Sequence, residues 1–418
     1  MVDVVCGLDF GTSNSTLALI KDGKPFLVPV DHGRSTIPSA IFYNFEDDST
    51  RFGQEAIDEY VQGTEGRLMR SLKSILGTAL IGERTVLRKR SVAFTEVIAD
   101  FLRHLKAATE AQYGIILRDV VAGRPVHFID DDADADSRAE RELAEIYRSV
   151  GFRNVEFQYE PIAAAFQYRR GAAMGDGQGE GLSFIVDIGG GTSDFSLVRT
   201  GVGEEATVLA THGVHLGGTD IDRIVSLETI MPNLGLGSGM KGKNLPVPSW
   251  LYNDLATWHK INGLYTNQIR TMVRQIELEA ARPDLIRRLR AVLDQRMGHA
   301  LLGIAESLKI ELSESRSVSF PLNIAGDPLA LDATAVQLRL FLKSWLASIK
   351  TAMSCTLALG GVKAYEVGTV FLTGGTTLSP IVRALVKSAF PRADIVSGDN
   401  FGAVGLGLAI DAERRFML

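Results

Sequence analysis

Residues 4–20 read VVCGLDFGTSNSTLALI, and residues 182–198 read LSFIVDIGGGTSDFSLV. Each stretch is an apolar run, an Asp-x-Gly-x turn and a second apolar run, which predicts two antiparallel strands joined by a polar turn. The same device stands near the start of each half of the chain. This self-similarity predicts a duplicated α/β domain in which each lobe carries one hairpin that faces a shared cleft.

Both turns are suited to binding phosphate. A glycine-rich turn lets backbone N–H groups approach phosphate oxygens, and a following hydroxyl adds another donor. One such turn is more often only a tight turn, but two with the same surroundings favour phosphate binding. The candidate donors are Gly11, Thr12, Ser13 and Asn14 in the first turn and Gly189, Gly190, Gly191 and Thr192 in the second.

The strand that follows each turn excludes two other phosphate-binding folds. A Walker loop and a dinucleotide-binding fold both need the glycines to begin a helix, and no Gly-x-x-x-x-Gly-Lys is present. Asp9 and Asp187 occupy equivalent positions before the two turns. A single such Asp would be read as a turn cap, whereas two can hold a hydrated Mg²⁺ through its water molecules.

The composition is that of a globular protein of more than one domain. The chain has 418 residues, 45% of them hydrophobic and 22% charged, and a formal net charge of -6. This charge disfavours nucleic-acid binding and indicates a small anionic ligand. Cys6 and Cys355 lie in apolar stretches and predict buried thiols, and no signal or membrane-spanning run is present, so we expect a cytoplasmic protein.

Several further elements are predicted from periodicity and composition. Residues 96–112 and 138–149 are typical of helices, and the acids of residues 130–136 indicate solvated side chains at a helix N-terminus. The Gly- and Pro-rich residues 231–248 predict a long mobile loop. Apolar residues at every third or fourth position from Ile286 to Leu308 predict one long amphipathic helix that begins near Pro283.

These motifs resemble the ATPase domain of the seventy-kilodalton heat-shock (DnaK-type) chaperones, within the superfamily that includes actin and the sugar kinases. The resemblance covers nearly the whole chain, in an ordered series of segments. They are GLDFGTSNS (7–15), EPIAAA (160–165), DIGGGTSD (187–194), LGGTDID (216–222), ESLKIELS (306–313), LTGGTT (372–377) and DNFGAVG (399–405).

The resemblance implies roles for particular residues. Lys73, in SLKSILG (71–77), takes the place of the family's lysine near the terminal phosphate and the attacking water, and Glu160 takes that of its acidic partner. With Asp9 and Asp187, these form the implied catalytic set. Pro125 falls where the family has its switch proline, with His127 where an aromatic residue is usual.

Further implied residues contact the nucleoside. Glu306, Lys309 and Ser313 share one polar face of a helix and correspond to ribose-contacting positions. Gly374, Gly375 and Thr376 form the other wall of the implied pocket. Two arginines that sandwich the base in the family are replaced by Ile310 and Leu378, which implies apolar contact with the base.

The resemblance also implies the domain organisation. Lobe I comprises residues 1–186, with an outer subdomain at 37–117 and a return of residues 399–418; lobe II comprises residues 187–398, with an outer subdomain at about 224–342. We expect no C-terminal peptide-binding domain, as in the short YegD-like bacterial subgroup. The implied function is that of a slow, monomeric Mg-ATPase that switches conformation and acts on protein partners. A small-molecule kinase and an actin-like filament protein are the alternatives.

Overall fold

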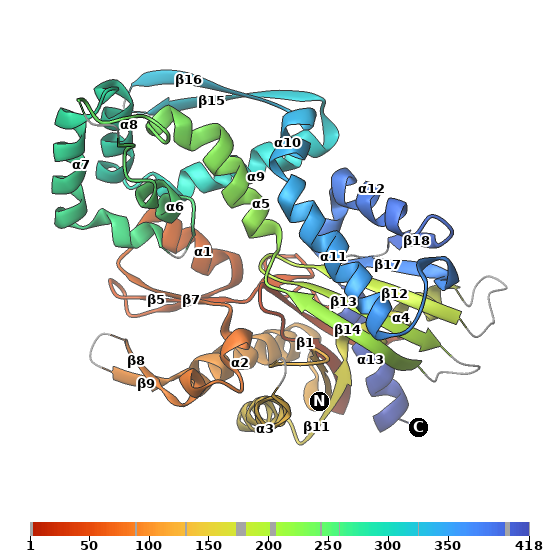
Figure 1. Ribbon diagram of the computed structural model, residues 1–418. Coiled ribbons are helices and arrows are strands. Elements are labelled where there is room, and N and C mark those ends of the chain that lie inside the picture. Colours follow the sequence, from red (N-terminus) through yellow and green to blue (C-terminus); the bar gives the residue numbers. More distant parts are fainter. Residues whose placement is uncertain are drawn as a thin grey trace. The chain divides into compact units, whose positions relative to one another are not determined.

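The computed structural model describes residues 3–87, 90–129, 132–172, 181–200, 206–242, 245–258, 260–324, 326–397 and 402–417 (Figure 1). Residues 130–131 of the acidic run, 243–244 of the expected loop and 399–401 of the last motif lie outside them. The chain divides into two compact units. Unit 1 comprises Met1–Val214, Ala352–Thr377 and Lys387–Leu418, and unit 2 comprises His215–Thr351 and Leu378–Val386.

Unit 1 contains two large sheets. The first is built from β1 (Asp3–Asp9), β2 (Asn14–Lys21), β3 (Lys24–Leu27), β4 (Ile37–Pro38), β10 (Ile116–Arg124) and β11 (Asn154–Tyr159). The second is built from β12 (Gly181–Ile188), β13 (Ser193–Thr200), β14 (Ala206–Val214), β17 (Thr369–Thr373) and β18 (Asp394–Ser397).

The two sheets have the same topology. Their strand orders are β11-β10-β1-β2-β3 and β18-β17-β12-β13-β14, and β4 pairs with β2 outside the common pattern. In each sheet the first hairpin strand, β1 or β12, is antiparallel to the next strand and parallel to β10 or β17. Further out, β2–β3 and β13–β14 are antiparallel, and β10–β11 and β17–β18 are parallel. The α/β fold class and the duplication predicted from the two hairpins are therefore confirmed.

Smaller elements complete unit 1. A three-stranded sheet contains β5 (Ala40–Asn44), β6 (Thr50–Phe52) and β7 (Gly66–Arg70), and β8 (Arg84–Leu87) pairs with β9 (Arg90–Ala93). The helices are α1 (Gly53–Gln62), α2 (Phe94–Tyr113), α3 (Ala133–Ser149), α4 (Glu160–Ala172) and α13 (Ala403–Phe416), with short 3-10 helices η1 (Leu72–Ile75), η2 (Ala79–Gly82) and η6 (Ala364–Glu366).

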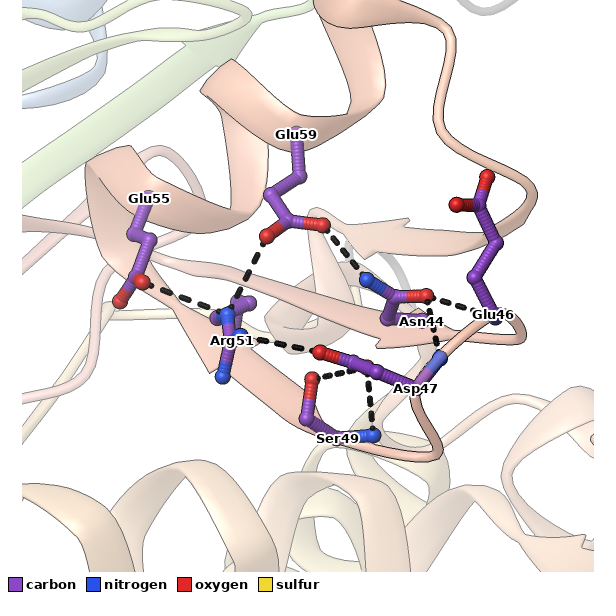
Figure 2. Close-up of polar contacts among 7 residues, drawn as sticks. All are labelled: Asn44, Glu46, Asp47, Ser49, Arg51, Glu55 and Glu59. Carbon is purple, nitrogen blue, oxygen red and sulfur yellow. Dashed lines mark hydrogen bonds and ion pairs between the residues drawn. The ribbon is translucent and has the colours of Figure 1, made fainter.

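A polar network fixes the turn between β5 and β6 against α1 (Figure 2). The Arg51 guanidinium pairs with carboxylates of Asp47, Glu55 and Glu59, each at 3.2 Å. The Asn44 side chain donates to Glu59 Oε2 at 2.8 Å and accepts the backbone N–H of Asp47 at 3.3 Å. Asn44 and Arg51 therefore hold this corner through the same glutamate.

Helix α13 packs closely against β1 and α4. A Cβ atom added at Gly7 of β1 would meet the backbone of Ala409, and one added at Gly407 would meet the backbone of Ala163 in α4. Only glycine allows backbones to approach so closely at these two positions. Helix α13 therefore contacts both the helix that begins at Glu160 and the strand that ends at Asp9.

Unit 2 is mainly helical. It contains α5 (Gly218–Val225), a π-helical turn η3 (Ser226–Ile230), η4 (Met231–Leu234), α6 (Trp250–Leu255), η5 (Ile261–Tyr265), α7 (Asn267–Glu279), α8 (Pro283–Asp294), α9 (Gly298–Glu314), the hairpin β15 (Ser317–Ile324) and β16 (Asp327–Thr334), and α10 (Ala335–Phe341). The elements α11 (Lys343–Leu359), η7 (Gly375–Leu378) and α12 (Pro380–Ala389) have residues in both units.

The single long helix expected from Pro283 onwards is wrong, because the chain forms two helices there. Arg296 adopts a left-handed backbone with φ +53°, which ends α8 at Asp294 before α9 begins at Gly298. The apolar spacing continues across the break because both helices contribute to buried surface. Periodicity therefore predicted the buried face and not the interruption.

Two other expectations, for residues 231–248 and for Cys355, need correction. Residues 231–248 are not simply a loop: η4 buries Met231 and Leu234, and Val247 N–H donates to Ser238 O at 2.8 Å. Cys355 is only half-buried, unlike Cys6. Among the helices of the described residues, none has the length and apolar character needed to cross a membrane.

The acidic run has two kinds of carboxylate. Asp132 caps α3 by accepting the N–H of Ala135 at 2.9 Å, as expected for an acid at a helix N-terminus. Asp136 instead pairs with Arg124 at 2.7 Å and accepts the N–H of Phe128 at 2.5 Å. The expectation of solvated acids is therefore wrong for Asp136.

Candidate functional site

The first hairpin turn is braced by a serine from the next segment. Asp9 pairs with Thr16 in the β1–β2 register, so the turn lies between these residues. The Ser39 hydroxyl donates to Gly11 O at 2.7 Å, and Ser39 N–H donates to Ser13 O at 2.8 Å. A Cβ atom at Gly11 would collide with the carbonyl of Asn14, so this turn requires glycine.

The second hairpin turn is held in an equivalent way. Asp187 pairs with Asp194 across β12 and β13, and Gly189 N–H donates to Thr192 O at 2.9 Å. The Thr376 hydroxyl donates to Gly189 O at 3.0 Å. Gly374, with φ +80°, lies so close that an added Cβ would be 2.7 Å from Asp187 Oδ1. The predicted Gly374 to Thr376 segment therefore lies against the second turn.

The predicted acidic and basic residues meet at the ends of these strands. Lys73 Nζ donates to Glu160 Oε1 at 2.5 Å, although 87 positions separate the two residues. A Cβ at Gly123 would lie 3.2 Å from Asp9 Oδ1 and 3.4 Å from Glu160 Cγ, which places both carboxylates beside this glycine. Lys73 is only 7% exposed, so it is not an ordinary surface lysine.

The backbone just before η1, the short helix that carries Lys73, has an uncommon conformation. Ser71, which precedes η1, has φ +56°, a left-handed conformation that non-glycine residues rarely adopt. Such conformations persist where the surrounding structure fixes them, and they cluster at functional sites.

Burial and mutual repulsion perturb the carboxylates. Burial and the neighbouring Glu160 raise the pKa of Asp9 to about 7, against a lowering effect of Lys73. Burial, followed by Asp194, Glu160 and Asp9, raises the pKa of Asp187 well above its usual range. Burial alone would lower the pKa of Lys73, but Glu160, Asp9 and Asp194 outweigh it and raise the pKa above its ordinary value. The carboxylates and the lysine of the site therefore perturb one another strongly.

The residues present fit a hydrated divalent cation. Asp9 Oδ1 is buried without a hydrogen-bond partner among the residues that the structure describes. Within that same part of the chain, no three His, Cys, Asp or Glu side chains are grouped closely enough to ligate a metal directly. The unpartnered oxygen of Asp9 fits a hydrated Mg²⁺, since Mg²⁺ keeps several of its waters.

A cavity of about 660 Å³ in unit 1 adjoins these groups. Its lining includes Glu160, Asp187 and Asp194, together with Pro125 and His127. These three carboxylates of the site are thus accessible to a ligand of small size. Asp194 was missed as a candidate from the sequence, although its place after the second turn mirrors that of Thr16 after the first.

The residues expected to contact the ribose lie on α9 in unit 2. Glu306 is exposed, Lys309 and Ser313 are half-buried, and the opposite face buries Leu301 and Leu308. Lys309 Nζ pairs with Asp222 Oδ1 at 2.6 Å, a partner that the sequence did not predict. Burial raises the pKa of Asp222 to about 6, although Lys309 opposes the shift. The polar face predicted for α9 is present, and its ribose contacts stay a prediction.

The two apolar replacements also lie in unit 2. Ile310 is 54% exposed and Leu378 is 50% exposed. Both are therefore available for apolar contact with a ligand.

The chain is similar to known proteins over nearly its whole length. The family model described as Hsp70 protein matches residues 5–233 and 287–414. The chain is 25% identical to the chaperone protein HscA homolog of Shewanella denitrificans and 26% identical to that of Aliivibrio salmonicida, over 97% of this chain and 58% and 57% of those proteins. It is 26% identical to the chaperone protein dnaK1 of Synechocystis, over 98% of this chain and 54% of that protein. The chain thus spans less than two thirds of the length of these relatives.

Proposed function

Because the chain belongs to the Hsp70 family, we propose that it is a Mg-dependent ATPase that hydrolyses ATP to ADP and phosphate. In this proposal the reaction drives a conformational switch that acts on protein partners. The protein is a cytoplasmic monomer of the short YegD-like subgroup, and its lobes follow the boundaries expected from the sequence. The contact between Lys73 and Glu160 beside two equivalent phosphate-binding turns carries the proposal.

Each group has a defined part in the proposed reaction. The two turns bind the phosphate chain through backbone N–H groups and hydroxyls. Lys73 neutralises charge that develops on the transferred phosphoryl group, and Glu160 orients the attacking water. When bound, Mg²⁺ would supply further neutralisation of phosphate charge, with Asp9 and Asp187 holding its waters. Glu306, Lys309 and Ser313 hydrogen-bond the ribose.

The proposal is tested by phosphate release from ATP. Purified protein should release phosphate with Mg²⁺ and cease to do so with excess EDTA, and a panel of sugars should leave the rate unchanged. Sugar-dependent ADP formation would instead indicate a small-molecule kinase. Sedimentation in each nucleotide state would reveal a filament protein, which is the other competing function.

A metal-site variant addresses the second turn directly. Asp187→Asn removes a charge that faces the hydrated metal, so calorimetry should show weaker binding of Mg-ATP. Unchanged Mg-ATP affinity would contradict the role proposed for Asp187.

A further inference from the structure

Arg124, the last residue of β10, has a buried and fully engaged side chain. It is 8% exposed. Its Nε donates to Pro125 O at 3.0 Å, and one terminal nitrogen donates to Val126 O at 3.2 Å and to Asp136 Oδ2 at 2.7 Å. The other terminal nitrogen pairs with Glu140. The guanidinium thus ties the end of β10 to two carboxylates of α3.

The same guanidinium contacts the residue that precedes Glu160. Arg124 Cζ lies 5.1 Å from the ring centroid of Tyr159 and 5.1 Å from that of Phe128. Tyr159 is the last residue of β11 and the register partner of Arg124 in the parallel β10–β11 pair. Because α4 begins at Glu160, a shift of the Tyr159 ring and backbone would move the Glu160 carboxylate.

A second contact holds Tyr159 from its backbone. Tyr159 N–H donates to the side-chain Oε1 of Gln158 at 2.9 Å, and Gln158 Nε2 donates to Asp411 Oδ2 at 2.9 Å. Asp411 is fully buried in α13 and pairs with Arg415 at 2.7 Å. The end of β11 is therefore fixed at its ring by Arg124 and at its backbone through Gln158.

Glu160 lies between like charges and a cation, so its exact position matters. The site places Glu160 beside Asp9, and both Asp9 and Asp187 gain electrostatic repulsion from it. Lys73 is the cation that attracts the Glu160 carboxylate. A carboxylate that is repelled by its neighbours keeps its place when the backbone that carries it is rigid.

We propose that Arg124 is a positioning residue that holds Glu160 in register with Lys73, an inference that rests on the proposed ATPase function. The task suits arginine because its planar guanidinium can contact aromatic rings and two carboxylates together, whereas the lysine ammonium is a compact point charge. Arg124 itself acts only through Tyr159 and the backbone of β11.

The decisive variant is Arg124→Lys, which keeps the charge and removes the planar fork. Single-turnover hydrolysis of bound ATP should slow by about 10-fold to 100-fold, while the Kd for Mg-ATP changes by less than about twofold, since misplacement by about 1 Å can cost about 100-fold. Tyr159→Leu should act in the same direction. Tyr159→Phe, which keeps the ring, should hydrolyse at the parent rate.

Arg51→Lys is the matched control. Arg51 also pairs with three carboxylates in unit 1, but it serves the β5–β6 corner (Figure 2). We expect it to leave the hydrolysis rate unchanged. A loss of rate in Arg51→Lys equal to that in Arg124→Lys would overturn the inference, because any disturbed arginine network would then have the same effect.

A double-mutant cycle separates positioning from general stability. If Arg124 acts through Glu160, adding Arg124→Lys to Glu160→Gln should slow hydrolysis by less than about twofold further. Additive losses, or weaker ATP binding that follows a lower Tm, would overturn the inference and indicate a merely structural arginine. If the parent protein hydrolyses ATP and Arg124→Lys hydrolyses it at the same rate, the inference about Arg124 is overturned while the proposed ATPase function stands. A parent that releases no phosphate overturns the proposed function and the inference with it.

Discussion

At the residue scale, the proposed chemistry depends most on the buried ammonium of Lys73. Its Nζ is 2.5 Å from Glu160 Oε1, and it is surrounded by carboxylates that raise its pKa. It therefore stays charged throughout the neutral range. A fixed positive charge in a site of low solvent access stabilises a migrating phosphoryl group more strongly than the same charge would in water.

We predict that Lys73→Ala binds ATP almost normally and loses most of its hydrolysis. The phosphate turns, the metal and α9 supply the proposed binding contacts, and none of them includes Lys73. Loss of one donor aimed at the transition state typically costs about 100-fold to 1000-fold in rate. A single-turnover assay beside calorimetry measures the two effects separately. Hydrolysis at the parent rate would exclude Lys73 from the reaction.

At this scale, short motifs predict the two hairpin turns, whereas Lys73 and Glu160 were expected only from the family resemblance. The turns at Gly11 and Gly189, and the carboxylates of Asp9 and Asp187, follow from local sequence because each motif is contiguous. Arg124 could not be found this way. Its partners come from α3 and β11, and only the fold brings these segments to the end of β10. Contacts between residues that are far apart in the sequence are not predicted by local motifs.

At the scale of elements, the contact between α13 and α4 helps to fix the position of α4, which carries Glu160 of the proposed site. Gly407 of α13 allows the backbone of Ala163 to approach, and Ala163 lies one turn after Glu160 on α4. Gly405 similarly lies beside the Thr16 side chain of β2. Bulk added to α13 at these glycines would displace elements that carry the proposed site.

We predict that Gly407→Ala lowers the free energy of unfolding by about 1 to 3 kcal/mol, the usual cost of overpacking. The added methyl group would meet backbone atoms of Ala163 that cannot move independently of α4. Gly303→Ala in α9 is the matched control, because a Cβ there meets nothing within 4 Å. That change should stabilise by about 0.5 to 1 kcal/mol through helix propensity. Urea denaturation that ranks the two variants equally would refute the packing argument.

The elements themselves were predicted unevenly. Strands β1, β2, β12 and β13 were expected because each is an apolar run that borders a polar turn. The break between α8 and α9 was not expected, because the residue that adopts a left-handed backbone there is Arg296 and not a glycine. The structure of residues 231–242 was missed for the opposite reason, because glycine and proline also occur in packed turns.

At the scale of the whole molecule, four carboxylates of the proposed site act electrostatically on Lys73 or on one another, namely Asp9, Glu160, Asp187 and Asp194. The formal net charge of the chain is -6. Without a metal, ionised Asp9 opposes folding because its pKa is raised from 3.8 to about 7. This cost is fully present above about pH 7 and is relieved as the pH falls from 7 towards 3.8.

The same shift predicts that stabilisation by Mg²⁺ and a non-hydrolysable ATP analogue is greater at pH 8 than at pH 6. The metal competes with the proton on Asp9, so at pH 6 binding must displace a proton from a group with a pKa of about 7. The apparent affinity for the metal–nucleotide complex should therefore be about tenfold lower at pH 6 than at pH 8. At a ligand concentration of 100 times the Kd at pH 8, binding stabilises the fold by about 2.7 kcal/mol at pH 8, and the tenfold loss of affinity would reduce this by about 1.4 kcal/mol at pH 6. Thermal unfolding at both pH values measures the difference, and Asp9→Asn should remove most of it. Equal stabilisation of the parent protein at the two pH values would show that Asp9 does not face the metal.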